Sequence, residues 1–176
     1  KVRHLAYFFG LWLAVETVFL HTGAVVRGPA ELARVYLSGW ISPQSPLWFI
    51  HELAIFYIVT RLVRRIRAVR VLAAGALLQI VSAAGLFNTG WSVADHFAQF
   101  YVFFFAGYAG APLAFRFALG AADRRKDLIT GLAAWAAIHT AFVALGIASL
   151  PLVSLILGFA GTFALIGAGV LLAALP

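Results

Sequence analysis

The chain has 176 residues, of which 64% are hydrophobic and only 11% are charged, whereas a soluble domain carries about 25% charged residues. This composition excludes an ordinary soluble domain and indicates that most of the surface faces lipid. Cysteine is absent, which excludes disulfides, thiolate metal sites and cysteine nucleophiles. A net charge of +7 would suggest a nucleic-acid partner in a soluble protein, but the apolar composition makes the positions of the charges more informative, and no nucleic-acid partner is expected.

Six apolar segments are long enough to cross a membrane, since a helix needs about 20 mainly apolar residues to do so and roughly 17 as a minimum. They cover residues 5–21, 46–63, 71–88, 96–115, 128–147 and 152–175. The sequence therefore predicts an all-α fold, a polytopic transmembrane helix bundle of about six spans that forms one domain over residues 1–176. In the last segment, the small residues Gly158, Gly161, Gly167 and Gly169 predict close approach to neighbouring helices.

The segment from Thr22 to Ser45 is too polar, and too interrupted by Gly and Pro, to cross a membrane. Glu31 and Arg34 stand three residues apart in it, the spacing of an ion pair on one helix face. We therefore predict a short helix here that lies on the membrane surface.

Two basic stretches, 61–70 and 116–127, predict the orientation of the chain. The first carries five Arg residues and the second carries three Arg and one Lys. Placing both stretches and the N-terminal Lys1 and Arg3 on one side of the membrane collects 11 of the 13 Lys and Arg residues there. The positive-inside rule makes that side cytoplasmic. Setting the topology is the simplest role for these charges, and binding of anionic lipid or a phosphorylated cofactor is the alternative.

Ionisable residues at membrane depth cost a few kcal/mol each, so each one needs a reason. The densest group opens the second span, where Ser45 and Pro46 are typical of a helix start. Trp48, His51 and Glu52 then fall on one face near the outer surface. An imidazole near a carboxylate suits general-base chemistry, but adjacent residues point in different directions, so His51 and Glu52 are expected to have different partners. The alternative is that these residues reach lipid head groups or cap neighbouring helices.

A second polar group runs from Asn88 to His96. Ser92 and Asp95 have the spacing of a capping box, a structural role that competes with a functional role for Asp95. Trp91 and His96 stand beside Asp95 at the outer end of the fourth span. They would approach the Trp48 and His51 group if the second and fourth spans pack together.

The remaining polar residues suggest structural roles. Glu16 and His139 lie inside spans and are predicted to be internal hydrogen-bond partners, and His21 lies at the outer end of the first span. No residues have metal-ligand spacing, and there is no GxSxG, P-loop or dinucleotide motif, so no metal site is expected.

Three strings resemble the acyltransferase 3 family, bacterial inner-membrane proteins that O-acylate glycans and small molecules. They are KVRHLAYFFGLW at residues 1–12, PLWFIHEL at 46–53 and TGWSVADHFAQFYVFFFAGY at 89–108. The resemblance covers essentially the whole chain, and its strings are apolar and less specific than a metal signature. It places the chain at the family's third to roughly eighth span. The chain begins at Lys1 without Met and stops after an apolar run, so we expect a piece of a longer protein that lacks the first two and the last spans.

The resemblance implies an acyl-CoA-type donor on the cytoplasmic side, an acceptor hydroxyl outside, and no bound cofactor. The family's catalytic histidine lies in its first span, so no residue of this chain is assigned a catalytic role. Candidate acceptor-binding residues are Trp48, His51, Glu52, Trp91, Asp95 and His96. Candidate donor-side residues are Arg61, Arg64, Arg65 and Arg116.

The resemblance implies that the protein lies in the bacterial inner membrane. Two other functions are alternatives to acyl transfer. A transporter or flippase for a lipid-linked glycan predicts inverted repeats and broken helices, and no repeat is evident. A non-catalytic membrane scaffold describes this piece if the essential histidine lies outside it, and by itself the piece is expected to be inactive.

Overall fold

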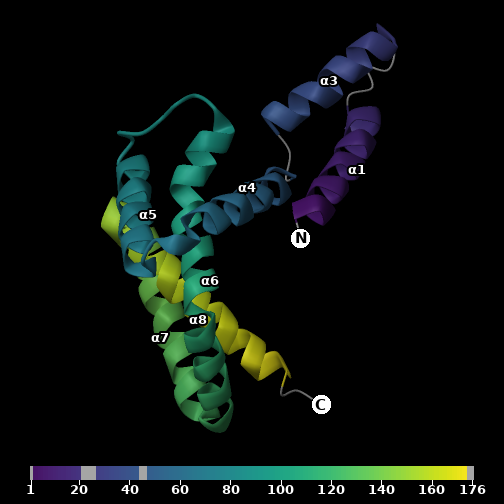
Figure 1. Cartoon of the computed structure of the whole chain (residues 1–176). Coiled ribbons are helices and arrows are strands. Elements are labelled where there is room, and N and C mark those ends of the chain that lie inside the picture. Colours follow the sequence, from purple (N-terminus) through teal and green to yellow (C-terminus); the bar gives the residue numbers. More distant parts are fainter. Residues whose placement is uncertain (1, 21–26, 44–46, 174–176) are drawn as a thin grey trace. The chain divides into compact units, whose positions relative to one another are not determined.

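The computed structural model describes residues 2–20, 27–43 and 47–173, and all of its regular structure is helical (Figure 1). This confirms the predicted all-α fold and places one α-helix in each of the six predicted spans. The elements are α1 (Val2–Leu20), α3 (Pro29–Ile41), α4 (Trp48–Leu62), the 3-10 helix η1 (Val63–Arg65), α5 (Ala68–Ala83), α6 (Ser92–Asp123), α7 (Arg125–Ala144) and α8 (Pro151–Ala173).

Within the described ranges, three helices are both long and apolar enough to cross a membrane: α6 over Ser92–Ala121, α7 and α8. α5 is a shorter apolar helix of 16 residues. At a rise of about 1.5 Å per residue it reaches roughly 24 Å, less than the hydrocarbon core of about 30 Å. The structure thus contains three candidate spans and one shorter apolar helix, and the count of six stays a prediction.

The end predicted for the third span, residue 88, is wrong because a glycine terminates α5 earlier. Gly85 has φ +73°, a left-handed conformation that glycine adopts without a steric penalty. The Leu86 N–H donates to the Val81 carbonyl at 3.1 Å, as in a Schellman motif. The helix therefore stops at Ala83, and the following residues form a turn and an extended loop.

α7 ends at Ala144 in the same way, three residues before the predicted boundary at 147. Gly146 has φ +70°, and the Ile147 N–H donates to the Phe142 carbonyl at 3.1 Å.

Gly146→Ala is expected to lower the free energy of unfolding by about 1–2 kcal/mol, because an L-residue is strained in the left-handed region. Gly131→Ala is the matched control in the same helix, since a Cβ there meets nothing within 4 Å. It is expected to stabilise by about 0.5–1 kcal/mol through helix propensity. Thermal unfolding in detergent compares the two, and a change of the same sign in both would contradict the proposed helix end.

The two basic stretches, predicted as loops, are mostly helical. α6 continues past residue 115 to Asp123, and Arg124 alone separates it from α7. The residues at 117–122 include Ala and Leu, which are strong helix formers. In the other stretch, only residues 66 and 67 lie outside helices. Most of these Arg residues therefore belong to helices, whereas Arg67 and Arg124 lie between helices.

The helices form two compact units. The first contains α1, α3, α4, η1 and residues 88–97, and the second contains α5, the rest of α6, α7 and α8. A single domain over 1–176 stays a prediction.

In the first unit, α1 buries Phe9, Leu13 and Thr17, which are spaced four residues apart on one face. α3 approaches the middle of α1 closely, since a Cβ on Gly10 would lie 2.9 Å from the Trp40 ring. The Trp40 ring also lies edge-on to Phe9, with centroids 4.9 Å apart. α3 is thus held against the middle of α1 by aromatic packing.

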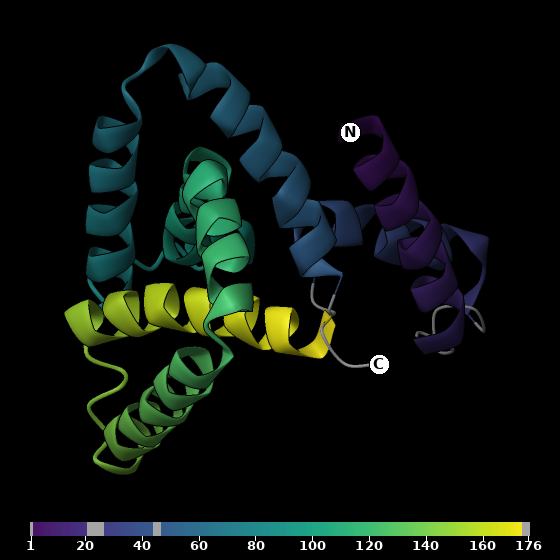
Figure 2. The same cartoon turned by 90° about the horizontal axis from the view of Figure 1, so that it is seen from below.

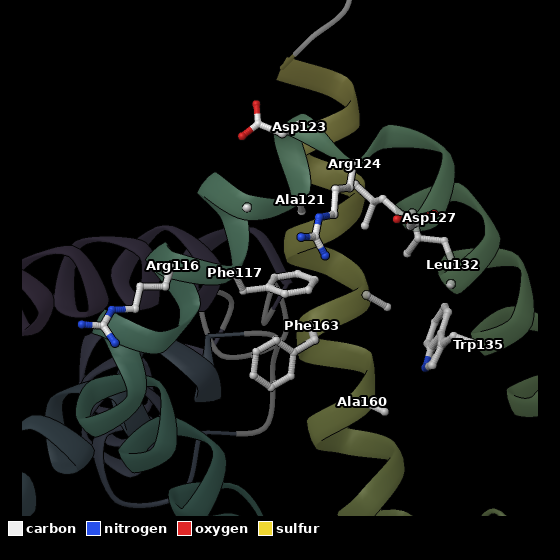
Figure 3. Close-up of a pocket in the computed structure, with 14 residues that line it drawn as sticks. Arg116, Phe117, Ala121, Asp123, Arg124, Asp127, Leu132, Trp135, Ala160 and Phe163 are labelled. Carbon is white, nitrogen blue, oxygen red and sulfur yellow. The ribbon is translucent and has the colours of Figure 1, made fainter.

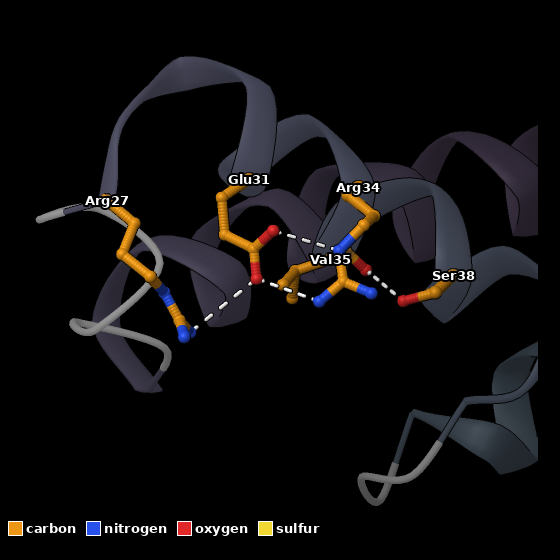
Figure 4. Close-up of polar contacts among 5 residues, drawn as sticks. All are labelled: Arg27, Glu31, Arg34, Val35 and Ser38. Carbon is orange, nitrogen blue, oxygen red and sulfur yellow. Dashed lines mark hydrogen bonds and ion pairs between the residues drawn. The ribbon is translucent and has the colours of Figure 1, made fainter.

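The helix predicted around Glu31 and Arg34 is confirmed as α3, and its position on a membrane surface stays a prediction. The Arg34 guanidinium donates to both Glu31 carboxylate oxygens at 2.8 and 2.9 Å, and Arg27 lies 3.6 Å from the same carboxylate (Figure 4). The hydrogen bonds from Arg34 lower the pKa of Glu31 below its ordinary value.

In the second unit, glycines give close helix contacts. A Cβ on Gly158 of α8 would lie 2.5 Å from the Phe103 ring, and one on Gly167 would lie 2.7 Å from Leu128. At these two positions the predicted close approach of the last span is confirmed, whereas a Cβ on Gly169 meets nothing within 4 Å.

A hydrogen bond joins α5 to α8 within the second unit. The Gln79 amide of α5 donates to the Ser154 hydroxyl near the start of α8 at 3.1 Å, and Figure 2 shows that end of α8 beside α5. Such bonds support helix association in apolar surroundings.

Candidate functional site

Glu52 of α4 is completely buried, with 0% of its surface exposed. Phe56 and Thr60, one and two turns further along the same face, are buried with it. Neither carboxylate oxygen of Glu52 has a hydrogen-bond partner among the described residues. Buried polar groups in proteins are normally hydrogen-bonded, so an unpartnered carboxyl group indicates a place where another group binds.

An aromatic pair lies one turn before Glu52. The Trp48 and His96 rings are 4.3 Å apart between centroids and tilted by 40°. One turn after Glu52, Phe56 and Phe97 are 5.7 Å apart. These ring contacts join α4, in the second predicted span, to the first turns of α6, in the fourth, which is the condition on which Trp48 and His96 were expected to approach each other. Trp48 and Phe56, one turn to either side of Glu52 on α4, thus contact the first turns of α6.

His51 belongs to a different neighbourhood from Glu52. Its ring lies 5.1 Å from that of Phe9 on α1. Its Nδ1 atom is buried without a partner among the residues described. No hydrogen bond joins His51 to Glu52 in this part of the chain, which agrees with the expectation that the two have different partners.

The capping box predicted for Ser92 and Asp95 is wrong. α6 begins at Ser92, so Trp91 precedes the helix, and its carbonyl accepts a bond from the Asp95 N–H at 3.1 Å. The Asp95 carboxylate instead accepts hydrogen bonds from the Thr89 N–H at 2.8 Å and the Thr89 hydroxyl at 3.0 Å. Asp95 thus holds the loop before α6, and a role in binding acceptor stays a prediction.

Trp91 also has a structural contact. Its indole N–H donates to the Ile41 carbonyl at 2.8 Å, a group that the end of α3 leaves without a helical partner. The ring is 49% exposed. Of the six predicted acceptor-binding residues, the structure therefore brings Trp48 and His96 together. Glu52 lies one turn along α4 from Trp48, His51 lies near α1, and Trp91 and Asp95 fix the loop.

Glu16 and His139 were predicted to be internal hydrogen-bond partners. The Nδ1 atom of His139 is buried without a partner in the described chain, so a hydrogen bond there is not seen, and the ring stacks on Trp135 with centroids 5.3 Å apart. Glu16 is half-buried. His21, Ser45 and Pro46 lie outside the described residues.

The predicted donor-side residues are all exposed. Arg61 is in the last turn of α4, and Arg64 and Arg65 are in η1. Arg61 is nine residues beyond Glu52, about 14 Å along the helix. Arg116 belongs to the second unit, where it lines a pocket of about 810 Å³ between α6, α7 and α8.

This pocket has an apolar floor and a charged rim (Figure 3). Sequence reasoning missed it, although Leu128, Leu132 and Trp135 repeat along one face of α7. The residues that line it are Arg116, Phe117, Gly120, Ala121, Asp123, Arg124, Asp127, Leu128, Gly131, Leu132, Trp135, Ala160, Phe163 and Ala164.

Within the described ranges, no group of three or more His, Cys, Asp or Glu side chains is placed to hold a metal ion. Comparison with known proteins adds no relative: no protein-family model, no curated protein and no solved structure matches the chain.

Proposed function

We propose that this chain is the membrane-embedded part of an O-acyltransferase. The enzyme would move an acyl group, with acetyl as the proposed group, from an acyl-CoA-type donor to a hydroxyl of a glycan or other envelope molecule. The sequence resemblance suggests the reaction. The structural observation that supports it best is the fully buried, unpartnered carboxyl group of Glu52.

A hydroxyl group of the acceptor is a suitable partner for Glu52. Burying a polar group without a hydrogen bond costs about 1–3 kcal/mol in proteins, and an acceptor hydroxyl that donates to the carboxyl group removes this cost. Trp48, one turn from Glu52 on α4, and His96, which packs on it, offer ring faces against which an apolar sugar face would pack. Together these groups would hold and orient the acceptor.

The transfer itself forms a bond between the acceptor oxygen and the acyl carbon and breaks the thioester C–S bond. The hydroxyl proton passes to a general base, and the thiol leaves with a proton. The resemblance implies that this base lies on a span outside the chain. The residues described here therefore act by positioning, and the piece alone is expected to be inactive.

The topology proposed for this enzyme has six spans in the bacterial inner membrane. α6, α7 and α8 are long and apolar enough to cross, and α1, α4 and α5 coincide with the other predicted spans. Stretches 61–70 and 116–127 would lie in the cytoplasm under the positive-inside rule. There, Arg61, Arg64, Arg65 and Arg116 would meet the phosphates of the donor, since guanidinium groups bind phosphate through paired hydrogen bonds.

Trp48→Ala in the full-length protein is expected to raise the KM for the acceptor by about threefold to tenfold, because an aromatic contact contributes about 0.5–1.5 kcal/mol. Trp12→Ala is the matched control, since Trp12 is 53% exposed on α1. An acyl-transfer assay with varied acceptor concentration checks this. Equal KM values for the two variants, at equal membrane levels, would remove the aromatic pair from the proposed site.

A further inference from the structure

We propose that the pocket between α6, α7 and α8 holds one phospholipid with a phosphoethanolamine head group. Its phosphate lies on Arg124, its ammonium group on Asp127, and one acyl chain on the apolar floor. This inference does not depend on acyl transfer. It requires only that α6, α7 and α8, the three helices long and apolar enough to span, lie in a membrane.

The floor of the pocket matches an alkyl chain. Phe117 and Phe163 pack edge to face with centroids 5.4 Å apart. Opposite them, Leu128, Leu132 and Trp135 repeat along α7 at the spacing of one helix face. Such a surface gains from contact with hydrocarbon and offers water few polar partners.

The depth of the pocket also matches one lipid leaflet. From Arg124 to Trp135, α7 advances by about 16 Å at 1.5 Å per residue. This is about half of the hydrocarbon core of roughly 30 Å. The charged rim lies at one end of the pocket and Trp135 at the other. A lipid could therefore lie in the pocket with its head group at the rim and its acyl chain toward Trp135, in the order found in a leaflet.

The rim carries charges of both signs that have no partner among the described residues. Arg116, Asp123, Arg124 and Asp127 make no ion pair or side-chain hydrogen bond within the described part of the chain. Figure 3 shows the Arg124 guanidinium directed toward the Phe117 and Phe163 rings, whereas Arg116 and Asp123 point away from them. Arg124 and Asp127 are therefore the groups that a head group above the floor would meet.

The pairing of one guanidinium with one carboxylate selects the head group. A guanidinium binds a phosphate through two parallel hydrogen bonds, and a carboxylate accepts hydrogen bonds from an ammonium group. A head group with a phosphate alone leaves the Asp127 carboxylate beside a like charge. An acyl-CoA donor that placed its phosphates on Arg124 would meet the same repulsion from Asp127. Arg116 points away from the floor, so its proposed contact with the donor lies outside this part of the pocket.

The test uses the purified full-length protein in detergent, titrated with phosphatidylethanolamine or phosphatidylglycerol and followed by thermal unfolding. We expect phosphatidylethanolamine to raise the melting temperature at lower concentration. Arg124→Gln should weaken its apparent affinity about tenfold or more. Asp127→Asn should abolish the preference between the two lipids. Arg125→Gln is the matched control, because Arg125 is exposed at the start of α7 and does not line the pocket.

Three results would overturn the proposal. One is equal stabilisation of the unaltered protein by both lipids, and another is unchanged affinity after Arg124→Gln. The third is displacement of phosphatidylethanolamine by acyl-CoA with the same dependence on Arg124, which would assign the pocket to the donor. If Arg124→Gln does not fold, Ala160→Trp serves instead, since it fills the pocket without changing charge, and retained lipid affinity in that variant contradicts the proposal.

Discussion

Replacement of Glu52 by leucine is expected to raise the free energy of unfolding by about 1–3 kcal/mol, the usual cost of a buried polar group that lacks a hydrogen bond. The carboxyl group has no exposed surface and no partner in the described chain. Leucine fills a similar volume and removes this cost, as hydrophobic replacement of buried charged groups often does. Unfolding in detergent, monitored by circular dichroism, measures the change.

Gln79→Leu provides the matched control for this variant. Gln79 is also buried, but its amide donates to Ser154. Its loss is expected to destabilise the protein by about 0.5–1.5 kcal/mol. If Glu52→Leu destabilised the full-length protein as Gln79→Leu does, Glu52 would have a structural partner elsewhere in that protein, and its role in the proposed site would be lost.

Gly158→Leu is expected to destabilise the second unit by about 1–3 kcal/mol, the usual penalty for overpacking a tight contact. A Cβ alone at this position would lie 2.5 Å from the Phe103 ring. The larger leucine must therefore push α8 away from α6 or displace Phe103, whose ring also packs 5.2 Å from that of Phe159. The shift in thermal unfolding temperature measures this loss.

Gly169→Leu in the same helix separates packing from helix propensity. A Cβ there meets nothing within 4 Å, and leucine favours the helix over glycine by somewhat less than about 1 kcal/mol. This variant is therefore expected to be neutral or slightly stabilising. Equal losses at both positions would mean that α8 does not pack on α6 through Gly158.

The helices could be predicted from the sequence because their signal is local. Long apolar segments placed a helix at each predicted span, and the spacing of Glu31 and Arg34 identified α3 with its ion pair. The ends of the helices were predicted less accurately, because hydropathy does not distinguish a glycine inside a helix from a glycine that ends it. Gly85 and Gly146 stop their helices, whereas Gly131 lies within one.

The site was predictable only where helix order constrained it. The approach of Trp48 to His96 was expected only on the condition that two predicted spans pack together. The burial of Glu52, in contrast, depends on which face of α4 meets its neighbours. The pocket brings together three helices whose contacts have no signature in a single sequence.

The most direct test of the proposed acyltransferase is the O-acyl content of cell-surface glycans. Mass spectrometry would compare cells that carry the intact full-length protein with cells that carry Glu52→Gln at equal membrane levels. Because a hydrogen bond between uncharged groups contributes about 0.5–1.5 kcal/mol, transfer should fall by about twofold to tenfold while glycan export continues. Unchanged O-acylation in the variant would contradict the site, and loss of glycan export instead of O-acyl groups would favour a transporter.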